Sequence, residues 1–143
     1  MRGYILVTAV CLASTVSATF FEDCGSVGSD VKVEVEGCNI PPCHLPRGDI
    51  LDVNIQFTSS RNTETLKIAA SAYIGGIEVP WPGVNTDACI NTQCPITEGS
   101  RVNWLMPVNI LKVYPKITTI VTFKLLDSAK EPQACVVIPA TIV

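Results

Sequence analysis

The stretch that decides the fold runs from Leu51 to Thr58 and reads LDVNIQFT. Apolar and polar residues alternate along it without a break. Because the side chains of a β-strand point alternately to its two faces, this pattern is typical of a strand with one face in a hydrophobic core and the other in water. Pro46 and Gly48 mark a turn before it. We therefore expect a half-buried β-strand over residues 51–58.

Other parts of the chain have the same strand character. The segments are 31–36, 66–74, 102–108, 117–126 and 134–142. Pro107 places its segment at the edge of a sheet, because proline cannot donate to a strand ladder. No segment repeats its apolar residues at a helical period over ten or more positions. Short strands joined by turns rich in glycine and proline predict an all-β sandwich of two sheets.

A second stretch, from Ile77 to Ile96, reads IEVPWPGVNTDACINTQCPI and does not alternate in this way. Pro80 and Pro82 enclose Trp81. Prolines fix φ and lack an N–H donor, so Trp81 must leave the preceding strand on a stiff, unpaired segment. Two interpretations stay open for this aromatic ring: a lid over a binding site, or a plug at the end of a closed core.

The N-terminus has the three parts of a secretory signal peptide. Met1 and Arg2 give a positive start, 4–16 is apolar or small, and Ala18 ends a run of small residues suited to cleavage. The apolar run is shorter than the ~20 residues that a membrane span requires, although a membrane anchor is the alternative. We predict a signal peptide over 1–18 and a single domain over 19–143.

Composition narrows the classes of partner. The formal net charge is −3 and no run of basic residues occurs, which argues against nucleic acid as a partner. Apolar residues make up 48 % of the chain and charged residues only 16 %, with a mean hydropathy of +0.37. With so few charged residues, a small soluble domain cannot easily shield all of these apolar residues from water.

Six cysteines follow position 18, and a secreted chain is expected to pair them. Six cysteines allow fifteen pairings, and the spacing narrows these. The predicted pairs are Cys38–Cys43 and Cys89–Cys94, which close small turns, and Cys24–Cys135, which joins the two ends. A zinc site built from the two C-x4-C pairs is the alternative.

Several motifs together resemble the Niemann-Pick type C2 family, which has the ML, or lipid-recognition, fold. They are Asp23-Cys24-Gly25-Ser26, 38–45 (CNIPPCHL) with Gly48, Val79-Pro80-Trp81-Pro82, Cys89, Cys94-Pro95-Ile96, Tyr114-Pro115 and 135–139. The resemblance spans essentially all of 19–143. It implies an immunoglobulin-like two-sheet β-sandwich with three disulfides and an apolar cavity between the sheets.

The resemblance also implies a lipid in that cavity. Trp81 and Tyr114 would form its mouth, with Pro107 and Val108 on the facing loop. Inward strand residues would form the wall, namely Val33, Val35, Val53, Ile55, Phe57, Ile68, Ile77, Val79, Val121, Phe123, Val136 and Ile138. Lys112 or Lys116 is a candidate contact for a fatty-acid carboxylate, although surface lysines are usually only solvated.

The chain departs from the vertebrate sterol carriers of this family in two ways. The segment from Pro107 to Tyr114 is longer, and Trp81 stands where they have phenylalanine, so the mouth differs in shape. No asparagine begins an N-x-S/T glycosylation site, which argues against glycan-dependent lysosomal sorting. The chain is closer to the invertebrate branch, whose members carry fatty acids, sterols or semiochemicals in extracellular fluid.

We therefore expect a secreted, extracellular, monomeric carrier without a cofactor, which passes its lipid to a membrane or receptor protein. An enzyme is not expected, because the single histidine, His44, has no evident catalytic partner. Three alternatives stay open: an innate-immune lipid-recognition accessory protein of the same fold, a lysosomal sterol-transfer protein, and a structural sandwich with a closed core.

Overall fold

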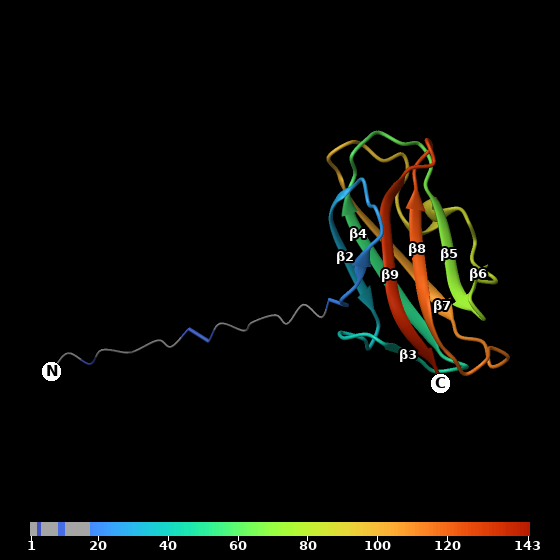
Figure 1. Ribbon diagram of the computed structural model, residues 1–143. Coiled ribbons are helices and arrows are strands. Elements are labelled where there is room, and N and C mark those ends of the chain that lie inside the picture. Colours follow the sequence, from blue (N-terminus) through green and yellow to red (C-terminus); the bar gives the residue numbers. More distant parts are fainter. Residues whose placement is uncertain (1–2, 4–8, 11–17) are drawn as a thin grey trace.

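The computed structural model describes residues 3, 9–10 and 18–143 (Figure 1). The predicted signal peptide therefore lies almost entirely outside the described residues. The elements are β1 (Glu22–Asp23), β2 (Ser29–Val35), β3 (Cys43–Leu45), β4 (Ile50–Thr58), β5 (Lys67–Ile74), β6 (Ile77–Pro80), the 3-10 helix η1 (Ala88–Asn91), β7 (Arg101–Asn109), β8 (Thr118–Leu126) and β9 (Pro132–Ile142). Across these described ranges, no helix has the length and apolarity needed to cross a bilayer.

The strands form two sheets that pack face to face, as Figure 1 shows. The larger sheet has the order β1-β9-β8-β5-β6, and β3 also pairs with β9. The smaller sheet has the order β2-β4-β7. All ladders are antiparallel except that of β3 with β9. The predicted two-sheet sandwich is confirmed, and β7, which contains Pro107, is an edge strand as expected.

Alternation in β4 fixes which residues face the opposite sheet. Val53, Ile55 and Phe57 are buried, and their polar neighbours lie on the outer face. β4 pairs with β7 so that Val53 lies opposite Met106 and Ile55 opposite Trp104. Because side chains across a ladder share a face, these residues form adjacent layers of one core.

All three predicted disulfides are present. Cys24–Cys135 joins β1 to β9, and the two short loops are closed by Cys38–Cys43 and Cys89–Cys94. The corresponding Cα–Cα distances are 5.0, 5.4 and 5.6 Å. The zinc alternative is therefore wrong, because all six cysteines are bonded to each other in pairs.

A buried carboxylate organises one end of the sandwich. Asp127 accepts hydrogen bonds from the Gln133 amide and from the backbone N–H groups of Ala129 and Glu131, at 2.9, 2.9 and 3.0 Å. Arg61 Nε lies 3.4 Å from its Oδ2. Burial raises the pKa of Asp127, but these donors and the Arg61 guanidinium outweigh burial and hold the pKa below its usual range. The cluster ties the β4–β5 loop to the β8–β9 turn.

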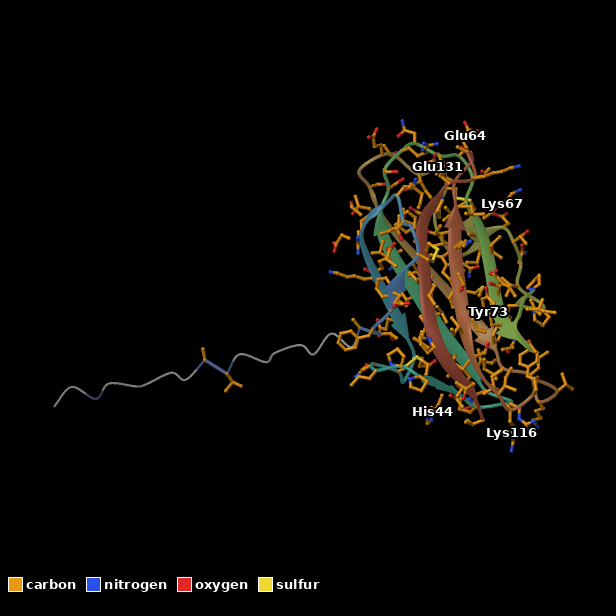
Figure 2. All side chains as sticks on the ribbon, in the orientation of Figure 1. His44, Glu64, Lys67, Tyr73, Lys116 and Glu131 are labelled. Carbon is orange, nitrogen blue, oxygen red and sulfur yellow. A yellow bond between two sulfur atoms is a disulfide. The ribbon has the colours of Figure 1, made fainter. Side chains whose placement is uncertain are left out.

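The two ends of the sandwich carry different residues. Figure 2 shows Glu64 and Glu131 at the end that carries the β8–β9 turn, and His44 and Lys116 at the opposite end. The C-terminus lies at this second end, as Figure 1 shows. Gln133, which comes just before the strand predicted over 134–142, is a fully buried residue of β9 and hydrogen-bonds to Asp127 and Ser60.

Candidate ligand-binding cavity

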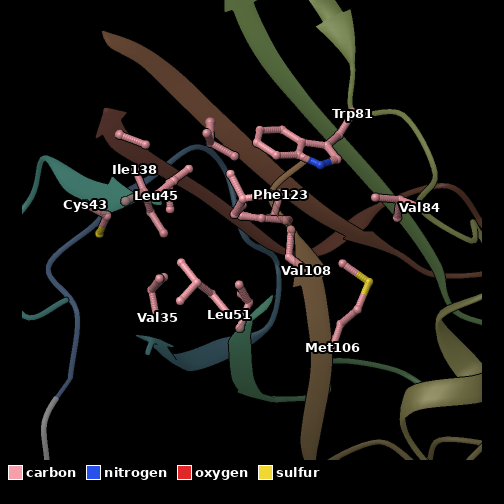
Figure 3. Close-up of a pocket in the computed structure, with 14 residues that line it drawn as sticks. Val35, Cys43, Leu45, Leu51, Trp81, Val84, Met106, Val108, Phe123 and Ile138 are labelled. Carbon is pink, nitrogen blue, oxygen red and sulfur yellow. The ribbon is translucent and has the colours of Figure 1, made fainter. Parts of the chain in front are cut away.

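A cavity lies between the two sheets (Figure 3). Its walls come from β2, β4 and β7 on one side and from β8 and β9 on the other, with β3 and the segment after β6 at its margins. The lining residues are Val35, Cys43, Leu45, Leu51, Val53, Trp81, Val84, Met106, Val108, Ile110, Val121, Phe123, Ile138 and Ala140. None of these side chains carries a charge, so the lining offers almost only hydrocarbon, sulfur and aromatic surface.

The cavity is small in this conformation, with a volume of about 40 Å³. One water molecule takes up roughly 30 Å³ in the liquid, whereas pockets that hold drug-sized ligands measure about 300–1,000 Å³. Any lipid between the sheets must therefore displace lining side chains. Met106 has three rotatable side-chain bonds and is suited to such repacking.

Trp81 covers one side of the cavity, as Figure 3 shows. The chain leaves β6 at Pro80, and the Trp81 N–H donates to the carbonyl of Ala70 at 2.8 Å. The indole meets the ring of Tyr114 edge to face, with 5.6 Å between centroids and an interplanar angle of 81°. Burial raises the pKa of Tyr114. We call this pair of rings the aromatic lid.

A second apolar hollow, with a volume of about 220 Å³, is lined by both rings of the aromatic lid. We call it the vestibule. Its lining comes from the C-terminal ends of β5, β6 and β9, from the start of β8 and from the segments that carry the two rings of the lid. The residues are Ala72, Ile74, Val79, Pro80, Trp81, Pro82, Tyr114, Pro115, Ile117, Thr119 and Ile142. Trp81 borders both hollows.

The loop that carries Tyr114 is hydrogen-bonded to the turn between β3 and β4. Arg47 Nη1 donates to the carbonyls of Lys112 and Tyr114, at 3.2 and 3.4 Å. Gly48 has φ +91°, and a Cβ there would lie 3.1 Å from the Lys112 side chain. A residue with a Cβ would be strained at this φ, and the absence of a side chain lets the turn lie close to Lys112.

The structure brings together many of the residues predicted for the site. Seven of the predicted wall and mouth residues line the cavity: Val35, Val53, Trp81, Val108, Val121, Phe123 and Ile138. Five others are buried in the surrounding core without lining it: Val33, Ile55, Phe57, Ile68 and Val136. Pro107 and Tyr114 border a surface hollow beside Trp81, at the mouth.

Two predicted wall residues lie elsewhere. Ile77 and Val79 are 67 % and 37 % exposed, and neither lines the cavity, although Val79 borders the vestibule. The reason is that β6 is a four-residue edge strand whose every residue is exposed. The resemblance implied a loop at Pro107 and Val108, but both lie within β7, in agreement with the strand predicted over 102–108.

Sequence reasoning missed several lining residues. Leu51 and Met106 occupy apolar positions of the alternating segments 51–58 and 102–108 but were not predicted for the site, and Ile110 continues the same two-residue period beyond β7. This continuation could have identified Ile110 as a lining residue from the sequence. Leu45 lies in a three-residue strand and Val84 in a loop, where periodicity says little, whereas Ala140 continues the two-residue period of β9.

Comparisons with known proteins agree on one family. The family model described as ML domain matches residues 18–142. NPC intracellular cholesterol transporter 2 of Mus musculus is 34% identical over 144 residues, covering 99% of this chain and 97% of the relative. NPC intracellular cholesterol transporter 2 homolog a of Drosophila melanogaster is 30% identical over 147 residues, with 99% of each chain covered. Mite group 2 allergen Pso o 2 of Psoroptes ovis is 33% identical over 144 residues, again with 99% of each covered.

A solved structure has the same fold. The crystal structure of a Niemann-Pick type C2 protein from Japanese carpenter ant superimposes with a TM-score of 0.76 at 23% identity, covering 87% of this chain and 99% of that one. Within the described residues, no group of three or more His, Cys, Asp or Glu side chains is arranged to hold a metal ion.

Proposed function

This chain belongs to the ML-domain family, with Niemann-Pick type C2 proteins among its relatives, and from this premise we propose that it carries a lipid between its two sheets. The observation that carries the proposal is the wholly uncharged lining of the cavity beneath Trp81. Such a lining can hold hydrocarbon but offers nothing to a polar substrate. A fatty acid, sterol or semiochemical fits this chemistry.

The free energy of binding is supplied mainly by burial of hydrocarbon. Each buried methylene contributes about 0.8 kcal/mol, so a long acyl chain has a gross term above ~10 kcal/mol before association and ordering costs are subtracted. Micromolar affinity, which corresponds to about 8 kcal/mol, is then reachable without an ion pair. The free energy needed to widen the cavity reduces this gain.

Lipid extraction tests the ligand class. Protein purified from its natural source is extracted with organic solvent, and the extract is identified by mass spectrometry. We expect one lipid molecule per chain, with a fatty acid or a sterol as the main species. The names of the mouse and fly relatives favour the sterol, and the extract distinguishes the two. Protein that carries no lipid and takes none up from a mixed-lipid solution would contradict the proposal.

We also propose that the chain is secreted and is not an enzyme. Thr19 is the point at which the chain becomes buried: its N–H donates to Val33 O at 2.8 Å, and its hydroxyl accepts from Val35 N–H at 2.8 Å, whereas Ala18 is exposed. Cleavage after Ala18 would leave this anchor intact. N-terminal sequencing of protein from the culture medium is expected to begin at Thr19. His44 is exposed on β3 and does not line the cavity, which supports the absence of catalysis.

A further inference from the structure

Arg47 is held in an unusual environment for a cation. Its Nη1 donates only to the backbone carbonyls of Lys112 and Tyr114, and its Nε is buried without a hydrogen-bond partner. Among the residues that the structure describes, no carboxylate lies within ion-pair distance of Arg47, not even that of Asp49 two positions away. The guanidinium is thus only partly satisfied.

A partly buried guanidinium normally pairs with an anion, because burial without a counter-ion is costly. Neutral carbonyls are weaker partners for it than a carboxylate, whose two oxygens match the guanidinium fork. The nearby loop adds further positive charge through Lys112 and Lys116, and Figure 2 shows Lys116 at this end of the molecule. Arg47, Lys112 and Lys116 therefore concentrate positive charge at this end of the molecule.

The position of Arg47 connects it to the aromatic lid. The carbonyl that accepts from Nη1 belongs to Tyr114, whose ring contacts the indole of Trp81. Trp81 lines both the vestibule and the cavity. A change of partner at Arg47 would therefore loosen the loop that holds the lid in place.

We propose that Arg47 binds the carboxylate of an anionic amphiphile such as a long-chain fatty acid, and that this contact draws the guanidinium away from the Lys112 and Tyr114 carbonyls and releases the lid. The inference rests on the proposed function and narrows its ligand class. The acyl chain enters the cavity, and the carboxylate replaces the two backbone carbonyls as the partner of Arg47. Neutral lipids of the same length gain the hydrophobic term but not this exchange.

The test compares hexadecanoic acid with its methyl ester in the wild-type protein, in Arg47→Met and in Arg101→Met. The control removes an equal charge from an exposed arginine of β7 whose partners are Asp30 and Thr58. Because charge-assisted hydrogen bonds are the stronger class, we expect the wild type and Arg101→Met to prefer the acid by about tenfold. Arg47→Met should bind acid and ester equally and should take up the ester faster than the wild type does.

Several outcomes overturn the inference. Equal wild-type affinity for acid and ester would do so without any variant, even if Arg47→Met failed to fold. A preference for the acid that persists in a folded Arg47→Met protein, or that is lost instead in Lys112→Gln or Lys116→Gln, would assign the contact elsewhere. Failure of both acid and ester to bind any form contradicts the proposed function itself. Binding of both with no effect of Arg47 leaves the carrier function standing and removes only the role of Arg47.

Discussion

Trp81 is the residue at which the cavity, the vestibule and the Tyr114 loop meet. Prolines flank it on both sides, and its N–H extends the pairing of β6 with β5 by donating to the carbonyl of Ala70. The sequence left open whether this ring is a lid or a plug. The structure places it over the cavity and against Tyr114, where it borders both hollows. This placement favours the lid.

Truncation of the lid should change the rates of ligand exchange. An aromatic pair contributes about 0.5–1.5 kcal/mol beyond area burial, so we expect Trp81→Ala to release bound fatty acid up to about tenfold faster. Trp81→Phe keeps a ring against Tyr114 and should stay within about twofold of the wild-type rate. Stopped-flow transfer of a fluorescent fatty acid to vesicles measures both. Equal release rates in all three proteins would mean that the ring is a plug of the core.

Because of Asp127, the free energy of unfolding should depend on pH in the acid range. Its pKa is lowered in the folded protein, so its contribution is fully present above the unfolded pKa of about 4 and is lost as the pH falls through the lower folded pKa. Asp127→Asn should cost about 1–3 kcal/mol at neutral pH, since it weakens several buried hydrogen bonds. The difference between wild type and variant should shrink below pH 4. Urea unfolding across this range tests the sign: a gap that widens in acid would contradict it.

At the scale of elements, alternation predicted which face of each long strand is buried. It succeeded for β4, β7 and β8 because a second sheet covers one of their faces. The family resemblance, and not alternation, placed Ile77 and Val79 on the cavity wall, and both are exposed in β6. A four-residue strand at the sheet edge has no partner layer. The cavity margin at Val84 depends on loop geometry, which pattern alone does not specify, whereas Ala140 continues the two-residue period of β9.

The disulfides should differ in their contribution to stability according to the loop they close. Cys24–Cys135 spans 111 residues, whereas Cys89–Cys94 spans 5. In the chain-entropy model the long loop contributes about 4–5 kcal/mol and the short one about 2 kcal/mol. Replacing both cysteines of each pair by alanine and measuring unfolding in urea should reproduce this order. A larger loss from the short loop would show that local packing dominates over chain entropy.

For the whole molecule, cysteine spacing, strand alternation and a set of short motifs were enough to predict the sandwich, its disulfides and its family. They also identified about half of the cavity lining. The size of the cavity was not predictable, because a closed core and a slot between splayed sheets give the same alternation. Because its volume is small, the proposed binding of a lipid there requires the two sheets, or the side chains between them, to move apart.

The central claim is that the lipid lies between the sheets, and the affinity of Val121→Trp for a fatty acid tests it most directly. Val121 lines the cavity, and an indole there fills the slot at a cost of about 1–3 kcal/mol in stability. Thr122→Trp places the same side chain on the outer face of β8 and is the matched control. Intact mass and thermal unfolding establish that both variants fold with three disulfides.

We predict that hexadecanoic acid, measured by displacement of a fluorescent fatty acid, binds Thr122→Trp as it binds the wild type. Val121→Trp should bind it at least tenfold more weakly, which corresponds to about 1.4 kcal/mol. A milder variant, Ala140→Leu, fills the same cavity with less added volume and should give a smaller loss in the same direction. A folded Val121→Trp protein with wild-type affinity would contradict the claim that the lipid lies between the sheets.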